Sequence, residues 1–292
     1  MKQKIGMVGI GLMGHGIARN LAKHGYPLTV LEHAGNQPLD ELKAAGVTTA
    51  TTAAALAASV DVLILCVTGS PEVEAVLTGP GGALQGLRAG AVVIDCSTAV
   101  PSSTERMQQA VHAAGGRFVD APMTRTAKEA HEGRLNLLVG AEPALFDEIR
   151  PVLSCFAENI TLAGPTGAGH RMKLLHNSVS LGFIALLAEA AACAERAGIA
   201  PEVLVDVLSK GGGGGVALER LTPYLLSRDT SGLKFAMGNA QKDLGYYMQM
   251  ARDTQAAHAI ATAVHGTYAS AVAQAGAQAM VPELVSILAQ RP

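Results

Sequence analysis

The chain has 292 residues, of which 49% are hydrophobic, and its formal net charge at pH 7 is −2. A chain of this length can bury two separate cores, which favours two domains. Its 22 lysine and arginine residues are scattered without a run or a basic helix face, so neither a nucleic acid nor a membrane surface is an expected partner.

The first part of the chain, up to about residue 163, alternates short β-branched runs with amphipathic helical stretches. This alternation predicts a largely parallel sheet covered by helices. The expected strands are Lys4–Val8, Leu28–Glu32, Val60–Val67, Ala91–Cys96, Arg117–Ala121, Leu135–Gly140 and Asn159–Leu162. We therefore expect an α/β domain over residues 1–163.

Three glycines, Gly9, Gly11 and Gly14, follow the first expected strand and open a helical stretch. This spacing in this context is the dinucleotide-binding fingerprint. Gly9 allows the tight turn, Gly11 lets backbone approach a pyrophosphate, and Gly14 lets the helix pack on the strand. Leu12 and Met13 lie at the helix N-terminus, where backbone N–H groups are available to the anion.

The second expected strand ends in Glu32, 23 positions after Gly9. A carboxylate near this place accepts hydrogen bonds from the adenine ribose hydroxyls. A 2′-phosphate would face the negative charge of Glu32, and the following residues 33–36 contain no arginine to neutralise it. Glu32 therefore favours NAD over NADP, although a solvated charge at a strand end is the alternative interpretation.

The four cysteines, at positions 66, 96, 155 and 193, lie far apart, and the first two fall inside expected strands. Buried, reduced thiols are the usual occupants of such positions. We therefore expect a cytoplasmic protein without disulfides. No grouping of histidine, cysteine and carboxylate residues has the spacing of metal ligands, so no metal is expected.

After Gly164 the sequence is dominated by alanine, leucine and glutamate at helical spacing. The turn-rich segment 164–169 is followed by one long helical pattern that ends at Gly198 and is expected to bridge two domains. Residues 164–292 should form an all-helical domain. The run Gly211–Gly215 is either a flexible turn or a close approach of backbone to a ligand.

Lys173 and Asn177 lie four residues apart on the bridging helix, so their side chains leave the same face. This spacing is common, and a surface lysine beside a polar neighbour is the simpler interpretation. The apolar residues that accompany them suggest instead a helix buried around most of its circumference: Leu174, Leu175, Val179, Leu181 and Phe183. A lysine within a buried helix points to a function.

Ordered blocks along nearly the whole chain resemble the β-hydroxyacid dehydrogenase family, which includes 3-hydroxyisobutyrate dehydrogenases and tartronate semialdehyde reductases. The blocks are Gly9–Gly14 with Ala18–Leu21, Asp95–Thr98, Asp120–Pro122 with Gly133 and Gly140, Gly167–Gly169 with Lys173 and Asn177, and Lys242–Leu244. The resemblance implies a Rossmann-type domain, a bridging helix, and a helical domain that builds homodimers or homotetramers.

The resemblance also implies an NAD-dependent enzyme that interconverts a short anionic β-hydroxy acid and its semialdehyde. Lys173 would be the general acid and base, with Asn177 holding the substrate or the lysine. Val67, Thr98 and Lys242 would contact the cofactor. A dinucleotide-binding scaffold without chemistry is the competing function, as in relatives that have lost the lysine.

The expected substrate loop departs from the family, because Thr124-Arg125-Thr126 stands where relatives have a hydroxyl residue and glycines. Arg125 adds bulk and a fixed positive charge where the anion of the substrate is expected. The loop partly resembles that of sulfolactaldehyde reductase, so a sulfonate substrate is an alternative. Arg125 could also face solvent or pair with Glu129. Phe235 is a further candidate substrate contact, from the helical domain.

Overall fold

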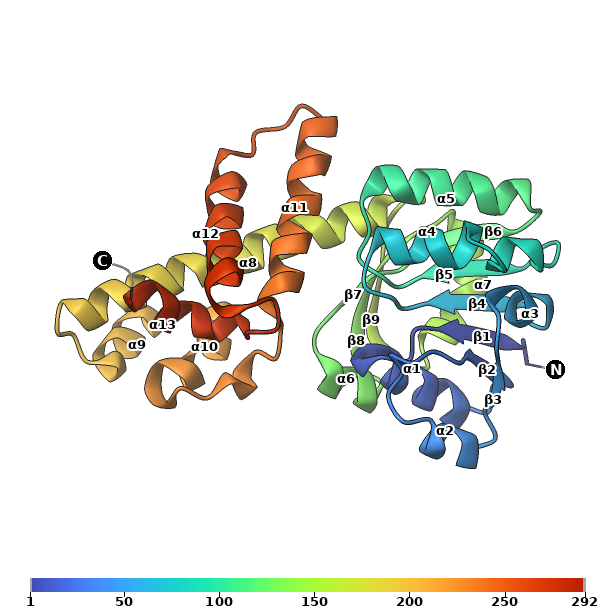
Figure 1. Ribbon diagram of the computed structural model, residues 1–292, viewed down its shortest axis with the longest axis horizontal. Helices are drawn as coiled ribbons and strands as arrows, with labels where there is room; N and C mark the ends of the chain where they lie inside the picture. The colour runs from blue at the N-terminus through green and yellow to red at the C-terminus, as the bar shows by residue number, and fades with distance from the viewer. Residues whose placement is uncertain (1, 291–292) are drawn as a thin grey trace. The chain divides into compact units, whose positions relative to one another are not determined.

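The computed structural model describes residues 2–290, which divide into two compact units. The first unit ends at Lys173 and the second begins at Leu174, so helix α8 (Ala168–Arg196) contributes to both (Figure 1). The domain boundary predicted at residue 163 coincides with the end of the sheet, whose last strand ends at Gly164. The compact units divide ten residues further along the chain.

The first unit is built on one nine-stranded sheet in the order β3-β2-β1-β4-β5-β6-β8-β7, with β9 paired to β8. The strands are β1 (Ile5–Val8), β2 (Leu28–Leu31), β3 (Thr48–Ala50), β4 (Val62–Leu65), β5 (Val92–Asp95), β6 (Arg117–Asp120), β7 (Met123–Thr124), β8 (Leu135–Gly140) and β9 (Ala157–Gly164). The first six run parallel, in the strand order of a dinucleotide-binding Rossmann sheet. β8 is antiparallel to β6 and β7.

Helices cover both faces of this sheet because its central strands are apolar on both sides. In β4, Val62 and Ile64 join one core, whereas Leu63 and Leu65 join the other. α1 (Leu12–Lys23), α2 (Asp40–Ala44) and α7 (Pro143–Leu153) pack on the first core. α3 (Ala53–Ala58), α4 (Ser70–Thr78) and α5 (Pro101–Ala113) pack on the second (Figure 1). The predicted α/β architecture is therefore confirmed.

All seven predicted strands are present, with ends that differ by up to two residues from the predicted ends. The prediction missed β3 and β7, which are short and partly polar edge segments. Neither has the run of apolar residues by which a buried strand is recognised in a sequence.

The second unit is entirely helical within its described residues, apart from one isolated bridge between Ala236 and Met280. Its helices after α8 are α9 (Pro201–Ser209), α10 (Val216–Ser227), α11 (Met237–Asp253), α12 (Ala259–Ala275) and α13 (Leu284–Ala289). They pack with the second half of α8 around Tyr268, which is fully buried and donates a hydrogen bond to the Leu181 carbonyl. The glycine run Gly211–Gly215 forms the turn between α9 and α10.

The long helix α8 differs from its prediction in one respect. Leu175 and Val179, predicted to be buried, are 44% and 74% exposed. Their face of the helix has no covering element within the described chain. The prediction of a helix buried around most of its circumference is therefore wrong. By length and composition α8 could cross a membrane, but half of its most apolar window is buried inside the protein.

Candidate active site

The carboxyl ends of β1, β4 and β5 are neighbours in the sheet, and the loops that follow them carry the predicted cofactor contacts. Gly9 follows β1, Val67 follows β4 and Thr98 follows β5. The Val67 amide donates a hydrogen bond of 3.0 Å to the Ser97 hydroxyl, which joins the last two loops. In parallel sheets of this order, ligands bind in the crevice at this edge.

The three loop glycines are each required for a different geometric reason. Gly9 has a φ of +89°, and a Cβ there would lie 2.2 Å from the Cys66 carbonyl oxygen. A Cβ on Gly14 would lie 1.9 Å from the Gly9 carbonyl oxygen, whereas a Cβ on Gly11 would meet nothing within 4 Å. Gly9 and Gly14 therefore close the turn, and Gly11 leaves open the space that a pyrophosphate needs.

Helix α1 begins directly after Gly11, and its first turn is suited to an anion. Gly11 is the N-cap and provides no side-chain cap to the N–H groups of the first turn. Those groups carry the positive end of the helix dipole. Leu12 is 71% exposed, whereas Met13 packs against the core below the loop. The residues present therefore fit a dinucleotide phosphate.

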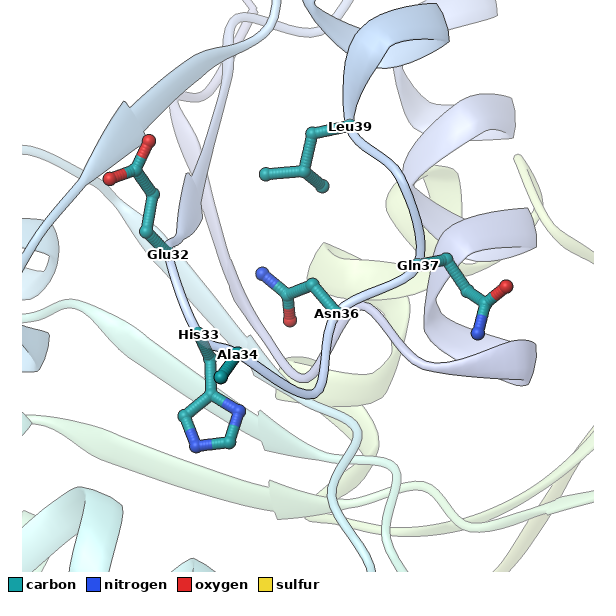
Figure 2. Close-up of a pocket in the computed structure, with 6 residues that line it drawn as sticks. All are labelled: Glu32, His33, Ala34, Asn36, Gln37 and Leu39. Carbon is teal, nitrogen blue, oxygen red and sulfur yellow. The ribbon is translucent and has the colours of Figure 1, made fainter.

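Glu32 lies at the rim of a cavity of about 440 Å³ that follows the carboxyl end of β2 (Figure 2). The cavity is lined by Glu32, His33, Ala34, Asn36, Gln37 and Leu39. The Glu32 carboxylate lies 3.7 Å from the Lys43 ammonium, and both side chains are well exposed. The contact of Glu32 with ribose hydroxyls stays a prediction.

Asn36 connects this cavity to the phosphate loop. Its side chain accepts a 3.3 Å hydrogen bond from the Ile10 amide and donates one of 2.9 Å to the Leu31 carbonyl. The Gln37 amide donates to the Ile10 carbonyl at 2.7 Å. In Figure 2 the Asn36 side chain points inward from the segment that encloses the cavity. Asn36 thus fixes the segment that follows β2 relative to the glycine loop, a role that the sequence analysis did not assign.

Helix α8 is fastened to the sheet at its first turn by Asp120, the last residue of β6. The Asp120 carboxylate accepts hydrogen bonds from the amides of Gly167 and His170, at 2.6 and 2.7 Å. Asp120 is fully buried, and a Cβ on Gly140 or Gly169 would approach its carboxylate within 3 Å. The two glycines therefore let the helix end come close enough for this capping.

Lys173 lies one turn further along α8 and reaches back to the segment that follows β6. Its Nζ donates a 2.6 Å hydrogen bond to the Met123 carbonyl and is partly buried. Two contacts thereby join the segment 120–123 to the segment 167–173. Asp120 accepts hydrogen bonds at the start of α8, and the Met123 carbonyl accepts one from Lys173. The lysine is held beside the loop Thr124–Thr126, which the resemblance assigns to the substrate.

Within that loop, Arg125 is engaged by protein groups. Its guanidinium forms an ion pair with Glu158 and a hydrogen bond to the Arg134 carbonyl. It lowers the pKa of the Glu158 carboxyl. The partner is thus an acid on β9 rather than the Glu129 considered from the sequence. Arg125 also has a φ of +80°, a conformation that favours glycine, the residue that the family resemblance leads one to expect here.

The two threonines of the loop have separate roles. Thr124 accepts a hydrogen bond from the Asn136 amide nitrogen at 3.1 Å across β7 and β8. Thr126 is the N-cap of α6 (Ala127–Glu132) and forms a capping box with Glu129. Glu129 is therefore committed to the cap, which explains why it does not pair with Arg125.

In the second unit, Asn177 is anchored by a residue that the sequence analysis did not single out. Its Nδ2 donates a 2.7 Å hydrogen bond to Asp243, and both side chains are buried. Its Oδ1 lies 3.0 Å from His176 Nδ1. Lys242 Nζ lies 3.2 Å from the other Asp243 oxygen and 5.3 Å from the Tyr246 ring centre.

The remaining candidate of the second unit, Phe235, is half-buried against the helical core. Its carbonyl accepts a hydrogen bond from the Val281 amide. Its role as a substrate contact stays a prediction.

The two cysteines near the crevice have raised pKa values. Burial raises the pKa of the Cys66 thiol to about 12 and that of Cys96 well above its ordinary value. Both thiols therefore stay protonated near neutral pH. All four cysteines are free in the structure, and Cys193 alone among them is exposed.

The chain matches two family descriptions that together cover most of its length. Residues 4–164 match the NAD binding domain of 6-phosphogluconate dehydrogenase. Residues 167–288 match the NAD-binding domain of NADP-dependent 3-hydroxyisobutyrate dehydrogenase. The two matches meet within the segment that precedes α8.

Individual relatives agree with these families. A 2-(hydroxymethyl)glutarate dehydrogenase of Eubacterium barkeri is 34% identical, over 86% of this chain and 83% of its own. A 2-hydroxy-3-oxopropionate reductase of Escherichia coli (strain K12) is 31% identical, over 85% and 84%. A solved structure of a Mycobacterium tuberculosis 3-hydroxyisobutyrate dehydrogenase with L-serine is 25% identical, covers 99% of both chains and has a TM-score of 0.88.

A matched pair of glycine variants tests the phosphate loop. In Gly14→Ala the new Cβ would lie 1.9 Å from the Gly9 carbonyl oxygen, so we expect the free energy of unfolding to fall by about 1–3 kcal/mol. Gly11→Ala meets open space in the protein and should cost less than about 1 kcal/mol. It should nevertheless weaken NADH binding about tenfold, because its Cβ occupies the phosphate side of the loop.

Urea denaturation and NADH fluorescence titration measure these two effects. Wild-type NADH affinity in Gly11→Ala would rule out this loop as the phosphate site. Wild-type stability in Gly14→Ala would contradict the close approach of Gly14 to the Gly9 carbonyl oxygen.

Proposed function

Because this chain belongs to the β-hydroxyacid dehydrogenase family, we propose that it interconverts a short anionic β-hydroxy acid and its semialdehyde, with Lys173 as general acid and base. The observation that carries the proposal is the hydrogen bond from Lys173 Nζ to the Met123 carbonyl, which holds the ammonium beside the loop Thr124–Thr126. The names of the two relatives from Eubacterium barkeri and Escherichia coli both refer to small organic acids.

A bound nicotinamide dinucleotide supplies the hydride that adds to the carbonyl carbon of the semialdehyde. Negative charge then develops on the carbonyl oxygen, and the Lys173 ammonium donates a hydrogen bond and finally a proton to it. In the oxidation direction, the neutral amine accepts the proton of the alcohol. The Met123 carbonyl accepts one N–H of the ammonium, and so fixes where Nζ stands relative to the substrate loop.

Asn177, one turn after Lys173 on α8, would help to hold the substrate or the lysine. Its Nδ2 is committed to Asp243. The Asn177 Oδ1 atom is therefore the hydrogen-bond acceptor of this side chain. It lies 3.0 Å from His176 Nδ1. Asp243 thus sets the orientation of the Asn177 side-chain amide. We propose that it keeps Asn177 Oδ1 in place as a hydrogen-bond acceptor for the substrate or the lysine.

Replacing Lys173 with methionine keeps an unbranched side chain that is one atom shorter and removes its proton donor. We expect kcat for semialdehyde reduction to fall about 10²–10⁴-fold, the usual contribution of a general acid. NADH affinity should stay at the wild-type value. Stopped-flow reduction and NADH fluorescence titration measure the two quantities, with the exposed Lys210→Met as the matched control. Full turnover in Lys173→Met would remove the proposed role.

We propose NAD as the preferred cofactor on the basis of Glu32. Glu32→Ser removes the carboxylate that would accept ribose hydrogen bonds and repel a 2′-phosphate, so the NADH-to-NADPH ratio of kcat/KM should fall at least about tenfold. Glu41→Ser, which removes an exposed carboxylate paired with Arg19, is the control. An unchanged ratio in Glu32→Ser would assign cofactor choice to other residues.

We propose that Arg125 exchanges Glu158 for the anion of the substrate. Arg125→Gly should raise KM for anionic semialdehydes about tenfold or more, and Glu158→Gln should lower KM by freeing the guanidinium. Stability should change little in Arg125→Gly, since glycine adopts the φ of +80° without strain. Steady-state assays with succinic, tartronic and methylmalonic semialdehydes and with sulfolactaldehyde separate carboxylate from sulfonate preference. If no KM changes in either variant, the ion pair is structural only.

We also propose that the enzyme is a homodimer or homotetramer that uses the uncovered face of α8. Met172, Leu175, Val179 and Leu186 are 41–74% exposed at helical spacing on this face. Light scattering should therefore give a mass of two or four chains for the wild type. Val179→Lys should shift the mass toward one chain, whereas Asp147→Lys, at an exposed position of α7 in the first unit, should not. A monomeric wild type would contradict this assembly.

A further inference from the structure

A buried polar cluster of the first unit takes no part in the proposed chemistry. It consists of Asp95, Ser97, Thr104, Asp120 and His170, none of which is more than 3% exposed. His170 lies at its centre and is fully buried. An imidazole in such a place has to satisfy both of its ring nitrogens from within the protein.

The two ring nitrogens of His170 contact two different elements. Nε2 lies 3.2 Å from the Ser97 carbonyl oxygen, and Nδ1 lies 2.8 Å from the Thr104 hydroxyl. A carbonyl can only accept, so the hydrogen-bond network places a proton on Nε2. The Thr104 hydroxyl can donate to Nδ1 or to the Val100 carbonyl, which lies 3.2 Å away. The contact between His170 and Ser97 is therefore the one whose donor and acceptor are determined, with Nε2 donating to the carbonyl oxygen.

The charged groups that face the ring do not fix its orientation. The nearest oxygens of Asp95 and Asp120 lie 3.8 and 3.9 Å from the ring nitrogens, beyond hydrogen-bond distance. Asp120 is already engaged by the backbone of α8, and the Asp95 oxygen Oδ1 accepts from the Ser97 amide. The hydrogen bonds to Ser97 and Thr104 are thus what holds the imidazole in place.

The contact between His170 and Ser97 joins two parts of the proposed site. On the helix side, Lys173 follows His170 by three residues, nearly one turn of α8. On the loop side, Ser97 precedes Thr98, and its hydroxyl accepts the hydrogen bond of the Val67 amide. The imidazole therefore links the lysine helix to the loops at the carboxyl ends of β4 and β5.

We propose that His170 is a positioning residue, which holds Lys173 at its working distance from the cofactor loops through the hydrogen bond from Nε2 to the Ser97 carbonyl. The inference rests on the proposed function, since it concerns the geometry between the general acid and the cofactor. It requires that loss of this one bond impairs the chemical step more than it impairs binding. A misplacement of about 1 Å can cost about 10²-fold in rate.

Two amide variants separate the two contacts of the ring. In His170→Gln the side-chain amide nitrogen reaches the place of Nε2 and can still donate to the Ser97 carbonyl. In His170→Asn the shorter amide reaches only the place of Nδ1 and keeps the contact with Thr104. Both variants remove the imidazole, and both carry a neutral amide. Thr104→Val removes the second contact alone, and His112→Asn changes an exposed histidine as the control.

We expect kcat to fall at least about tenfold in His170→Asn and less than about threefold in His170→Gln and Thr104→Val. KM for the semialdehyde and the NADH dissociation constant should stay within about threefold of wild type in all of them. Thermal melting identifies any variant that fails to fold. If His170→Asn is one of these, His170→Leu, which also lacks a donor to the Ser97 carbonyl, takes its place in the comparison with His170→Gln.

A readout that does not depend on turnover is the long-range ¹H–¹⁵N spectrum of the unliganded protein. The spectrum should show one histidine with a slowly exchanging proton on Nε2, and its signals should be absent from His170→Gln. Equal kcat in the Asn and Gln variants, or a proton on Nδ1 alone, would overturn the inference while the proposed function stands. A wild type that reduces no semialdehyde would overturn the proposed function and this inference with it.

Discussion

The capping of helix α8 by Asp120 is the contact on which the placement of Lys173 depends. A buried carboxylate is costly unless hydrogen bonds compensate it, and here two backbone amides at a helix N-terminus do so. The approach is close enough only because Gly140 and Gly169 lack side chains. The start of α8 is thereby fixed to the end of β6. Lys173 then donates a hydrogen bond to the Met123 carbonyl, in the segment that follows β6.

The parts of the fold that depend on local pattern could be predicted from the sequence. Continuous apolar runs gave the buried strands, and the glycine spacing gave the phosphate loop with a distinct role for each glycine. Contacts between distant residues could not be predicted in this way. Glu158 is 33 positions from Arg125, and Asp243 is 66 positions from Asn177, so no spacing rule relates them. The exposure of Leu175 and Val179 was missed because periodicity identifies an apolar face but not whether the chain covers it.

Arg125 shows how one substitution can change a site without changing the fold. The loop keeps the backbone conformation that suits glycine, and the arginine carries a positive φ there. Its charge is balanced by Glu158 on β9, so the loop remains compatible with a folded protein before any substrate is bound. Under the proposed exchange at Arg125, substrate preference would depend on how well an anion competes with the Glu158 carboxylate.

The central claim is that the chain transfers hydride to a semialdehyde, rather than only binding the dinucleotide. The most direct test is to incubate the protein with NADH carrying deuterium at nicotinamide C4 and a panel of anionic semialdehydes, and to analyse the products by mass spectrometry and NMR. We predict a β-hydroxy acid with one deuterium on its carbinol carbon, formed from one stereoisomer of the labelled cofactor. Tight NADH binding with no deuterium in any product would contradict it and identify a dinucleotide-binding scaffold.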